Sequence, residues 1–295
     1  MLEGLLMIDF SDWIEYEGAS EGSGRSIKIW LKSPTNNQIG LFKFKKDIST
    51  TDHISECIAN QLSLQVGMEC AKFDLGVYKG NEGSMSYNIL QDVDDILLEG
   101  VGFITSKYPS FNPNTLRDDT GAVYSIEMIQ SIFGKSVPFI DLLKVFIFDY
   151  LIGNTDRHQS NWAVLRHKGE MRISPIYDNS SSLCAYMNED KIVKCLGNDL
   201  MLWNSILINK STSIIRIRMS DVKRPQHIEV LRFIRDNFYK ETRDFASTIS
   251  VELQSNKIAI ILDMYDSYLS PNRKELIQKY LECKVSTLQE LYFGG

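Results

Sequence analysis

Residues 153–161 read Gly-Asn-Thr-Asp-Arg-His-Gln-Ser-Asn and place Asp156 five positions before Asn161. A phosphoryl-transfer site needs a group that orients the attacking hydroxyl and accepts its proton, and it needs an oxygen ligand for Mg²⁺ nearby. An Asp and an Asn at this spacing can supply both from one short loop. The pattern alone is a weak signal, because Asp-x-x-x-x-Asn occurs by chance in many chains.

The sequence on either side of this loop makes the signal stronger. Residues 138–151 are apolar nearly all round, which predicts a central, buried helix running into the loop. Residues 162–165 and 171–174 predict a short hairpin after it, and Asp178 follows seventeen positions after Asn161. A loop, a hairpin and then a metal-binding Asp is the order found in kinases.

The first third of the chain predicts short strands with one helix between them. The helix should begin between Ser49 and Asp52, where capping-type residues precede apolar positions at helical spacing. A turn over residues 79–83 predicts a hairpin between the last two strands. The predicted strands cover residues 13–17, 27–31, 39–44, 72–78 and 84–90.

The acidic stretch 91–95 marks a change from strand-like to helical patterns. We therefore predict an α+β protein with two lobes, a β-rich lobe over residues 1–92 and a mainly helical lobe over 93–295. Further helices are expected around residues 228–238 and 258–269. For residues 286–295, a packed and a disordered segment are both open.

Composition excludes several classes of protein. The 43% apolar and 24% charged residues are typical of a globular protein, and the net charge of -6 argues against broad affinity for nucleic acid. The basic segment 216–224 is more simply a solvated edge. The chain contains no run of about 18 apolar residues, so no membrane span is predicted. Residues 1–4 also lack the basic start of a secretory signal. We therefore expect a cytoplasmic protein that binds no membrane.

The five cysteines and four histidines show no metal-ligand spacing. The scattered cysteines indicate reduced, mostly buried thiols rather than a disulfide framework. Oxygen ligands and Mg²⁺ are therefore the expected inorganic chemistry.

Four motifs in order resemble HipA-like kinases. Residues 152–161 resemble the family pattern G-N-x-D-R-H-x-x-N, and residues 174–178 resemble its P-x-Y-D element. Residues 41–44 resemble the strand with an ATP-contacting lysine, and residues 55–59 the helix with its glutamate partner. The resemblance covers roughly residues 10 to 185. It implies an ATP- and Mg²⁺-dependent serine/threonine protein kinase.

The resemblance also implies the role of each matched residue. Asp156 would be the catalytic base, and Asn161 and Asp178 would be Mg²⁺ ligands. Lys43 would hold the α- and β-phosphates, with Glu56 fixing that lysine through an ion pair.

Each of these residues also has a plainer interpretation. Lys45 lies on the same strand face as Lys43, although Lys43 is favoured, and Glu56 alone would be an ordinary surface carboxylate. His158, grouped here with the nucleotide-binding candidates, is more simply a histidine that hydrogen-bonds the loop. Arg157 would either steady phosphate charge or form a structural ion pair, and Asn154 would support the loop backbone.

The Gly- and Ser-rich segment 17–26 is either a loop that folds over ATP or a mobile hairpin loop. It is not a Walker motif, because no G-K-[ST] is present. In HipA-like kinases a serine in this region can be autophosphorylated, and the added charge would repel nucleotide phosphates. The candidates are Gly22, Ser23, Gly24 and Gln91 for the nucleotide, and Ser20, Ser23 and Ser26 for autophosphorylation.

The resemblance implies partners as well as chemistry. The sequence begins almost at the first strand, so we expect a short form lacking the extra N-terminal subdomain of longer HipA proteins. A toxin of a toxin–antitoxin system would act on a protein such as an aminoacyl-tRNA synthetase or another translation factor, and it would bind an antitoxin protein. A kinase for a small molecule or lipid, and a nucleotide-binding pseudokinase, remain as alternatives.

Overall fold

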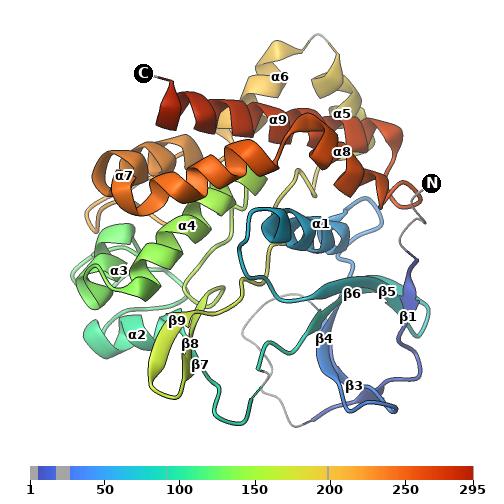
Figure 1. Ribbon diagram of the computed structural model, residues 1–295, viewed down its shortest axis with the longest axis horizontal. Coiled ribbons are helices and arrows are strands. Elements are labelled where there is room, and N and C mark those ends of the chain that lie inside the picture. Colours follow the sequence, from blue (N-terminus) through green and yellow to red (C-terminus); the bar gives the residue numbers. More distant parts are fainter. Residues whose placement is uncertain (1–5, 18–26, 91, 198, 295) are drawn as a thin grey trace.

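A computed structural model describes residues 6–17, 27–90, 92–197 and 199–294 of the protein. Figure 1 shows a β-rich part at the N-terminal end and a helical part that forms the other half of the molecule. The helix α1 (Asp52–Gln65) lies between the curved sheet and the helices.

Six strands of the described chain form the sheet of the first lobe. All neighbours run antiparallel except β1 and β5, which are parallel. Alternate residues of the strands point inward, and their aromatic and apolar side chains, among them Phe42 and Met85, form a small separate core. The strand order is β1 (Ile8–Asp9), β5 (Phe73–Tyr78), β6 (Asn81–Tyr87), β4 (Ile39–Phe44), β3 (Lys28–Lys32) and β2 (Ile14–Glu15).

Two of the predicted strands differ most from those observed. The β5–β6 turn is only Lys79 and Gly80, both with positive φ (48° and 79°), so β6 begins at Asn81 rather than at residue 84. A two-residue turn of this kind matches the natural twist of a hairpin and needs no further loop residues. The predicted strand 13–17 is reduced to Ile14–Glu15 at the edge of the sheet.

The helix α1 forms where the sequence predicts it. Its apolar face, with Ile54, Cys57, Ile58 and Leu62, is buried in the main core. It packs against β5 and β6 on one side and against α8 (Ser255–Asp263) on the other. The helix is therefore held between the two lobes.

The second lobe surrounds α4 (Val137–Ile152), whose residues are buried nearly all round as predicted. A three-stranded sheet, among the described residues, lies at its edge. The other elements are β7 (Ile96–Glu99), α2 (Gly100–Lys107), α3 (Ile126–Phe133), β8 (Ala163–His167), β9 (Glu170–Ile173), α5 (Glu189–Leu196), α6 (Leu200–Asn204), the π-helical turn η1 (Ser205–Asn209), α7 (His227–Glu252) and α9 (Pro271–Phe293).

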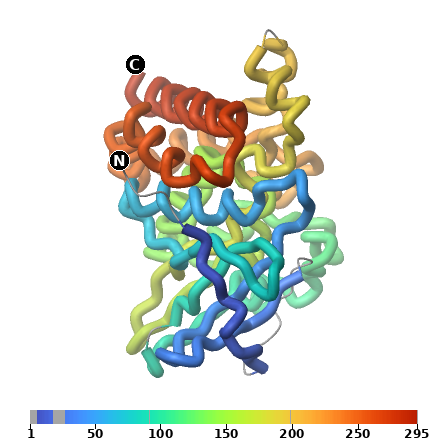
Figure 2. The backbone as a smooth tube through the Cα atoms, turned by 90° about the vertical axis from the view of Figure 1, so that its right-hand side faces the viewer, coloured from blue at the N-terminus to red at the C-terminus, as the bar shows by residue number. Residues whose placement is uncertain are grey.

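Residues 286–293, for which a packed and a disordered segment were both open, are packed in helix α9. Helix α9 runs to Phe293 and buries Leu288 and Tyr292. Helices α5 and α6 project from the body of the molecule beside α9 (Figures 1 and 2). No helix in the described ranges is long and apolar enough to cross a membrane.

Backbone hydrogen bonds join the two lobes close to the motif residues. The Ala71 N–H donates to the Ile176 carbonyl and the Ile176 N–H donates to the Glu69 carbonyl, each at 2.9 Å. The Thr51 N–H, at the start of α1, donates to the Ala185 carbonyl at 3.1 Å. Residues 176–185, which contain Asp178, are thus attached to the first lobe at both ends.

Candidate active site

A three-residue ion-pair network joins the lobes. The Lys43 Nζ on β4 donates to Glu56 Oε1 on α1 and to Asp178 Oδ1 on the second lobe, both at 3.0 Å. The second Glu56 oxygen accepts the Asn179 N–H at 2.8 Å. Residues far apart in the sequence therefore meet at one point, and Glu56 holds both the lysine and the backbone beside Asp178.

Electrostatics keep Lys43 and Asp178 charged, whereas burial raises the pKa of Glu56. Burial opposes the charged form of Lys43, but Asp178 and Glu56 hold the pKa of Lys43 above its ordinary value. Burial also opposes the charged form of Asp178, yet Lys43 outweighs it and lowers the pKa of Asp178 to about 2. At neutral pH the network holds an ammonium beside an ionised carboxylate.

The loop that carries Asp156 starts at the C-terminal end of α4. Gly153 ends the helix in the left-handed conformation, with φ 68° and ψ 37°. A Cβ at this position would lie 2.2 Å from the Tyr280 hydroxyl of α9. Backbone geometry and the lack of space both require glycine here.

Asp156 is fixed through its backbone, which leaves its carboxylate for chemistry. Its N–H donates to Asn154 Oδ1, and its carbonyl accepts the Asn161 amide at 2.8 Å. The His158 N–H donates to the same carbonyl, and His158 Nδ1 accepts the Ser160 N–H. Burial raises the pKa of Asp156, against the influence of nearby His158 and Lys46.

Arg157 is a buried structural residue, so the ion-pair interpretation holds for it. Its guanidinium donates to both oxygens of Asp149 on α4. It also donates to the carbonyls of Asn161 and Tyr177, at 2.8 and 2.6 Å, and to the Asn179 side chain. One side chain thereby ties the Asp156 loop to the segment that bears Asp178.

Asn154 supports the loop as predicted. Its side-chain amide donates to Asp149 Oδ1 at 3.1 Å, and its carbonyl oxygen accepts the Asp156 N–H. Asp149 therefore anchors both Asn154 and Arg157 from the last turns of α4.

Asp178 has a left-handed backbone, with φ 57°. This conformation is uncommon for residues other than glycine, although Asp tolerates it better than most. The Asn179 contacts with Glu56 and Arg157 hold it in place. Such locally strained positions occur at functional sites, where the surrounding contacts fix them.

The donor chemistry fits Mg²⁺. Asn161 and Asp178 offer an amide and a carboxylate oxygen, which are hard ligands of the kind Mg²⁺ prefers. The described residues contain no cluster of three or more His, Cys, Asp or Glu that could hold a metal ion. This agrees with a site in which one or two protein ligands share the ion with phosphates and water.

The remaining sequence candidates fall in two groups. Lys45 pairs with the exposed Glu82 at 2.9 Å and takes no part in the network around Lys43. Gly22, Ser23, Gly24 and Gln91, together with Ser20 and Ser26, lie outside the described residues.

Two buried residues that carry no sequence motif, His227 and Lys284, support the Asp156 loop through hydrogen bonds. His227, at the start of α7, donates through Nε2 to the Asn154 carbonyl at 2.8 Å and accepts at Nδ1 from the Ser211 hydroxyl. The Ser211 hydroxyl in turn accepts from Lys284 Nζ of α9 at 3.0 Å. The one local signal was the capping pattern of Gln226 and Glu229 around His227. The contacts themselves join residues far apart in the sequence, so no local sequence pattern predicts them.

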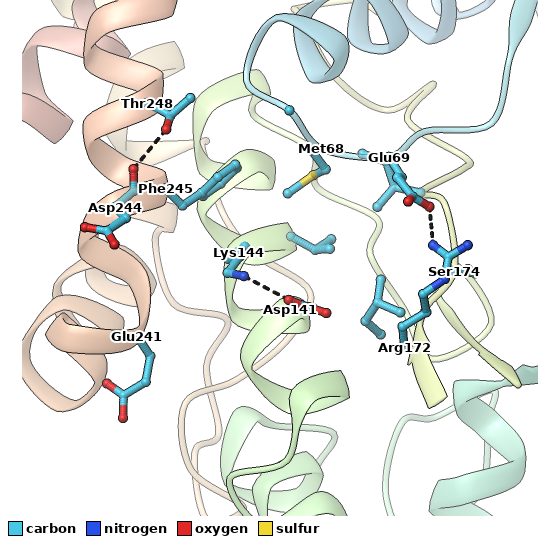
Figure 3. Close-up of a pocket in the computed structure, with 14 residues that line it drawn as sticks. Met68, Glu69, Asp141, Lys144, Arg172, Ser174, Glu241, Asp244, Phe245 and Thr248 are labelled. Atoms are coloured by element: carbon cyan, nitrogen blue, oxygen red, sulfur yellow. Dashed lines mark hydrogen bonds and ion pairs between the residues drawn. The ribbon is translucent and has the colours of Figure 1, made fainter. Parts of the chain in front are cut away.

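A cavity of about 480 Å³ lies between α4, α7 and β9 (Figure 3). Four of its charged side chains form two pairs, Asp141 with Lys144 and Glu69 with Arg172. None of the residues of the Lys43 network lines it, and neither does Asp156. This cavity is therefore separate from the candidate active site.

Comparison with known proteins shows which proteins this chain resembles. The family model of the HipA-like C-terminal domain matches residues 121–228. The serine/threonine-protein kinase CtkA of Helicobacter pylori is 27% identical over 288 aligned positions, covering 92% of this chain and 82% of that protein.

Two solved structures share the fold. The crystal structure of the H. pylori proinflammatory kinase CtkA matches with a TM-score of 0.79 at 21% identity, covering 97% of this chain and 98% of that one. The HipA of Shewanella oneidensis MR-1, solved with HipB and operator DNA, matches with a TM-score of 0.59 at 15% identity, covering 95% and 67%. The resemblance to HipA-like kinases and the two-lobed α+β fold are therefore confirmed.

Proposed function

We propose that the protein is a serine/threonine protein kinase that uses ATP and Mg²⁺. The observation that carries the proposal is the network of Lys43, Glu56 and Asp178, which lies across the two lobes at the loop of Asp156 and Asn161. A lysine ammonium held between carboxylates where the two lobes meet is what phosphate positioning requires. The similarity to CtkA supports the same activity.

The roles of the side chains follow from their positions. Lys43 binds the α- and β-phosphates, and Glu56 prevents the lysine from turning away. Asp156 orients the acceptor hydroxyl and accepts its proton as the oxygen attacks the γ-phosphorus. The bond from that phosphorus to the bridging oxygen breaks, and ADP leaves with the electron pair. Positioning of this kind accounts for most of the catalysis in phosphoryl transfer.

Asn161 and Asp178 are the residues that would hold Mg²⁺, and the ion would neutralise charge on the phosphates. Arg157 keeps these two residues at a fixed separation, because it binds the carbonyl of Asn161 and the carbonyl next to Asp178. His158 supports the loop and does not take part in proton transfer.

The test is phosphate transfer from γ-labelled ATP, with wild type and Asp156→Ala compared in the presence and absence of a cell extract. A positioned base contributes about 10²–10⁴-fold, so Asp156→Ala should lose transfer by that factor. His158→Gln should retain most of it. Mass spectrometry then identifies the labelled acceptor.

Each outcome separates the proposal from its alternatives. Label on protein hydroxyls that depends on Asp156 supports a protein kinase. Label found only in small molecules or lipids would instead indicate a small-molecule or lipid kinase. Nucleotide binding with no label anywhere would indicate a pseudokinase. Label on this chain would locate autophosphorylation, for which Ser20, Ser23 and Ser26 are the candidates.

We further propose a toxin role in the cytoplasm, with an aminoacyl-tRNA synthetase or another translation factor as acceptor and an antitoxin protein as partner. The structural likeness to a HipA that was solved with HipB motivates this proposal. Induced expression of wild type should arrest growth, and expression of Asp156→Ala should not. Equal growth of both cultures would contradict the toxin role while leaving the kinase proposal intact.

A further inference from the structure

A second cavity, of about 410 Å³, lies beside the Asp156 loop. Gly153 and Thr155 line it on one side, and residues 181–182 and 184–187, which follow Asp178, line it on another. Leu202 and Ile206 close it from the projecting α6–η1 segment, and Ser211 and Tyr280 form part of its buried floor. Its position next to Asp156 makes it reachable by a chain segment that presents a hydroxyl to that residue.

The cavity wall is positively charged, although the protein carries a net charge of -6. Lys191 and Lys210 are the charged residues of the lining, and no carboxylate lines it. Neither lysine forms an ion pair with another described residue. Since most surface lysines lie near acidic neighbours in a chain of this charge, two unpaired ammoniums at one cavity leave a local excess of positive potential.

A buried lysine lies behind the floor of the cavity. Lys284 is only 3% exposed, and among the described residues it forms no ion pair with a carboxylate. Its ammonium donates to the Leu207 carbonyl and to the Ser211 hydroxyl, and it lies over the rings of Tyr150 and Tyr280. Burial without a counter-charge lowers the pKa of Lys284 to about 7, and an anion in the adjoining cavity would raise it again.

The rim between the cavity and the reaction centre is formed by Tyr186. This side chain is 49% exposed, and its hydroxyl accepts from Lys46 at 2.7 Å and contacts the Ser181 hydroxyl at 3.2 Å. Thr155, the neighbour of Asp156 in the chain, lines the cavity, so an acceptor chain passing over this rim can reach it within a few residues of its hydroxyl.

We propose that this cavity binds an acidic side chain, Asp or Glu, of the acceptor protein, close in sequence to the phosphorylated hydroxyl. The proposal rests on the proposed function, because it places the acceptor chain at Asp156. Lysine ammoniums suit a carboxylate, whereas a phosphorylated residue is usually bound by the planar fork of arginine, and no arginine lines the cavity. Aliphatic contacts with Met187, Leu202 and Ile206 would accept the methylene stem of the side chain.

The test uses peptides with one serine and a Glu placed in turn at each of the four positions on either side of it. Each peptide has a partner with Gln in place of Glu. For wild type we expect kcat/KM to favour Glu over Gln by about tenfold at one position, which is what two ammoniums of about 0.5–1 kcal/mol each would give. The double variant Lys191→Glu with Lys210→Glu should lose or invert that ratio.

A matched control lies on the same helix. Lys194 of α5 is exposed and does not line the cavity, so Lys194→Glu makes the same charge change without altering the Glu-to-Gln ratio. A wild-type ratio near one at every position would overturn the proposal. So would a preference that the double variant retains, because the acidic residue would then be bound elsewhere. Preference for phosphoserine peptides over Glu peptides, lost in the double variant, would overturn the choice of a carboxylate.

Fluorescence anisotropy of the same peptides separates this proposal from the proposed function. A Glu-dependent affinity that disappears in the double variant supports the cavity as an anion site even when no peptide is phosphorylated. Absence of transfer in that case contradicts the kinase activity and not the cavity. Phosphate transfer without any Glu dependence would support the kinase activity and contradict the cavity proposal.

Discussion

Arg157 shows how one side chain connects stability with the geometry of the site. Its contacts reach α4, the Asp156 loop and the Asp178 segment, and both it and Asp149 are almost completely buried. Desolvating two charges is unfavourable, so the pair is stabilising only while all its hydrogen bonds are made. Arg157, which sets the distance between the two proposed metal ligands, is thus also a residue whose loss would leave a buried charge without a partner.

We expect Arg157→Met to lower the free energy of unfolding by about 3–5 kcal/mol, because it leaves the Asp149 carboxylate buried without a partner. Urea denaturation measures this change. Arg172→Met is the control, since its pair with Glu69 is exposed and should contribute less than about 1 kcal/mol. Similar losses in both variants would contradict the role assigned to Arg157.

Lys284 gives a pH-dependent prediction. Burial lowers the pKa of Lys284 to about 7 from the ordinary 10.5. Between these values the unfolded chain binds a proton that the folded chain lacks, so stability rises with pH, by at most about 1.4 kcal/mol per pH unit. The neighbouring Cys184 thiol stays protonated over most of this window, because burial raises its pKa to about 12.

The measurement is urea denaturation of wild type and Lys284→Met at pH 7, 8 and 9. Wild type should gain stability relative to the methionine variant as the pH rises, since methionine fills a similar volume and does not titrate. A constant difference between the two proteins over this range would show that Lys284 is not a neutralised buried amine.

At the scale of elements, the junction between α4 and its following loop positions Asp156. Gly153 combines a left-handed φ of 68° with close contact to Tyr280 of α9. Gly67, just after α1, has the same φ but no atom within 4 Å of a Cβ position. Substitutions at these two glycines therefore distinguish the effect of backbone strain from the effect of crowding.

We expect Gly67→Ala to destabilise by about 1–2 kcal/mol, the usual penalty for a left-handed L-residue. Gly153→Ala should be clearly worse in thermal unfolding, because Tyr280 or the loop must also move. Displacement of the loop should lower transfer by roughly 10²-fold. Adding Tyr280→Phe should restore part of both losses. Equal destabilisation by the two alanine substitutions would contradict the crowding argument.

Elements specified by local pattern were predictable from the sequence. The strand 39–44 and the buried helix after Pro138 have side-chain periodicity that survives without tertiary contacts. The start of β6 was misplaced, because Asn81, Glu82 and Gly83 have turn composition while pairing with β5 overrides it. Local preference is weak where a neighbouring strand offers hydrogen bonds.

At the scale of the molecule, the ion pair of Lys43 with Glu56 was expected from the family resemblance, but the contact of Lys43 with Asp178 was not predicted. The roles of these residues remain predictions. The contacts that hold the motif segments together were not predictable, since His227 reaches Asn154 and Lys284 reaches Ser211 over long sequence separations. Neither histidine nor lysine is a usual core residue, so no composition rule points to them.

The whole molecule should respond to nucleotide as one unit, because its lobes meet at the network of Lys43 and at residues 176–185. A ligand that binds only the folded state stabilises it by about 2.7 kcal/mol at 100 times its Kd. For a chain of 295 residues that corresponds to a rise in Tm of about 4 °C. We expect a non-hydrolysable ATP analogue with Mg²⁺ to give such a rise in wild type and in Asp156→Ala, since Asp156 acts on the acceptor.

The residues that hold the nucleotide should change this rise in Tm. Removing Mg²⁺ with a chelator should reduce the rise in wild type, and Asp178→Asn should reduce it by the same amount. Lys43→Met should lose most of the shift, and Lys45→Met, which breaks only the exposed pair with Glu82, should keep it. The opposite result for the two lysines would mean that nucleotide binds along another face of β4 and that the network joins the lobes without holding phosphate.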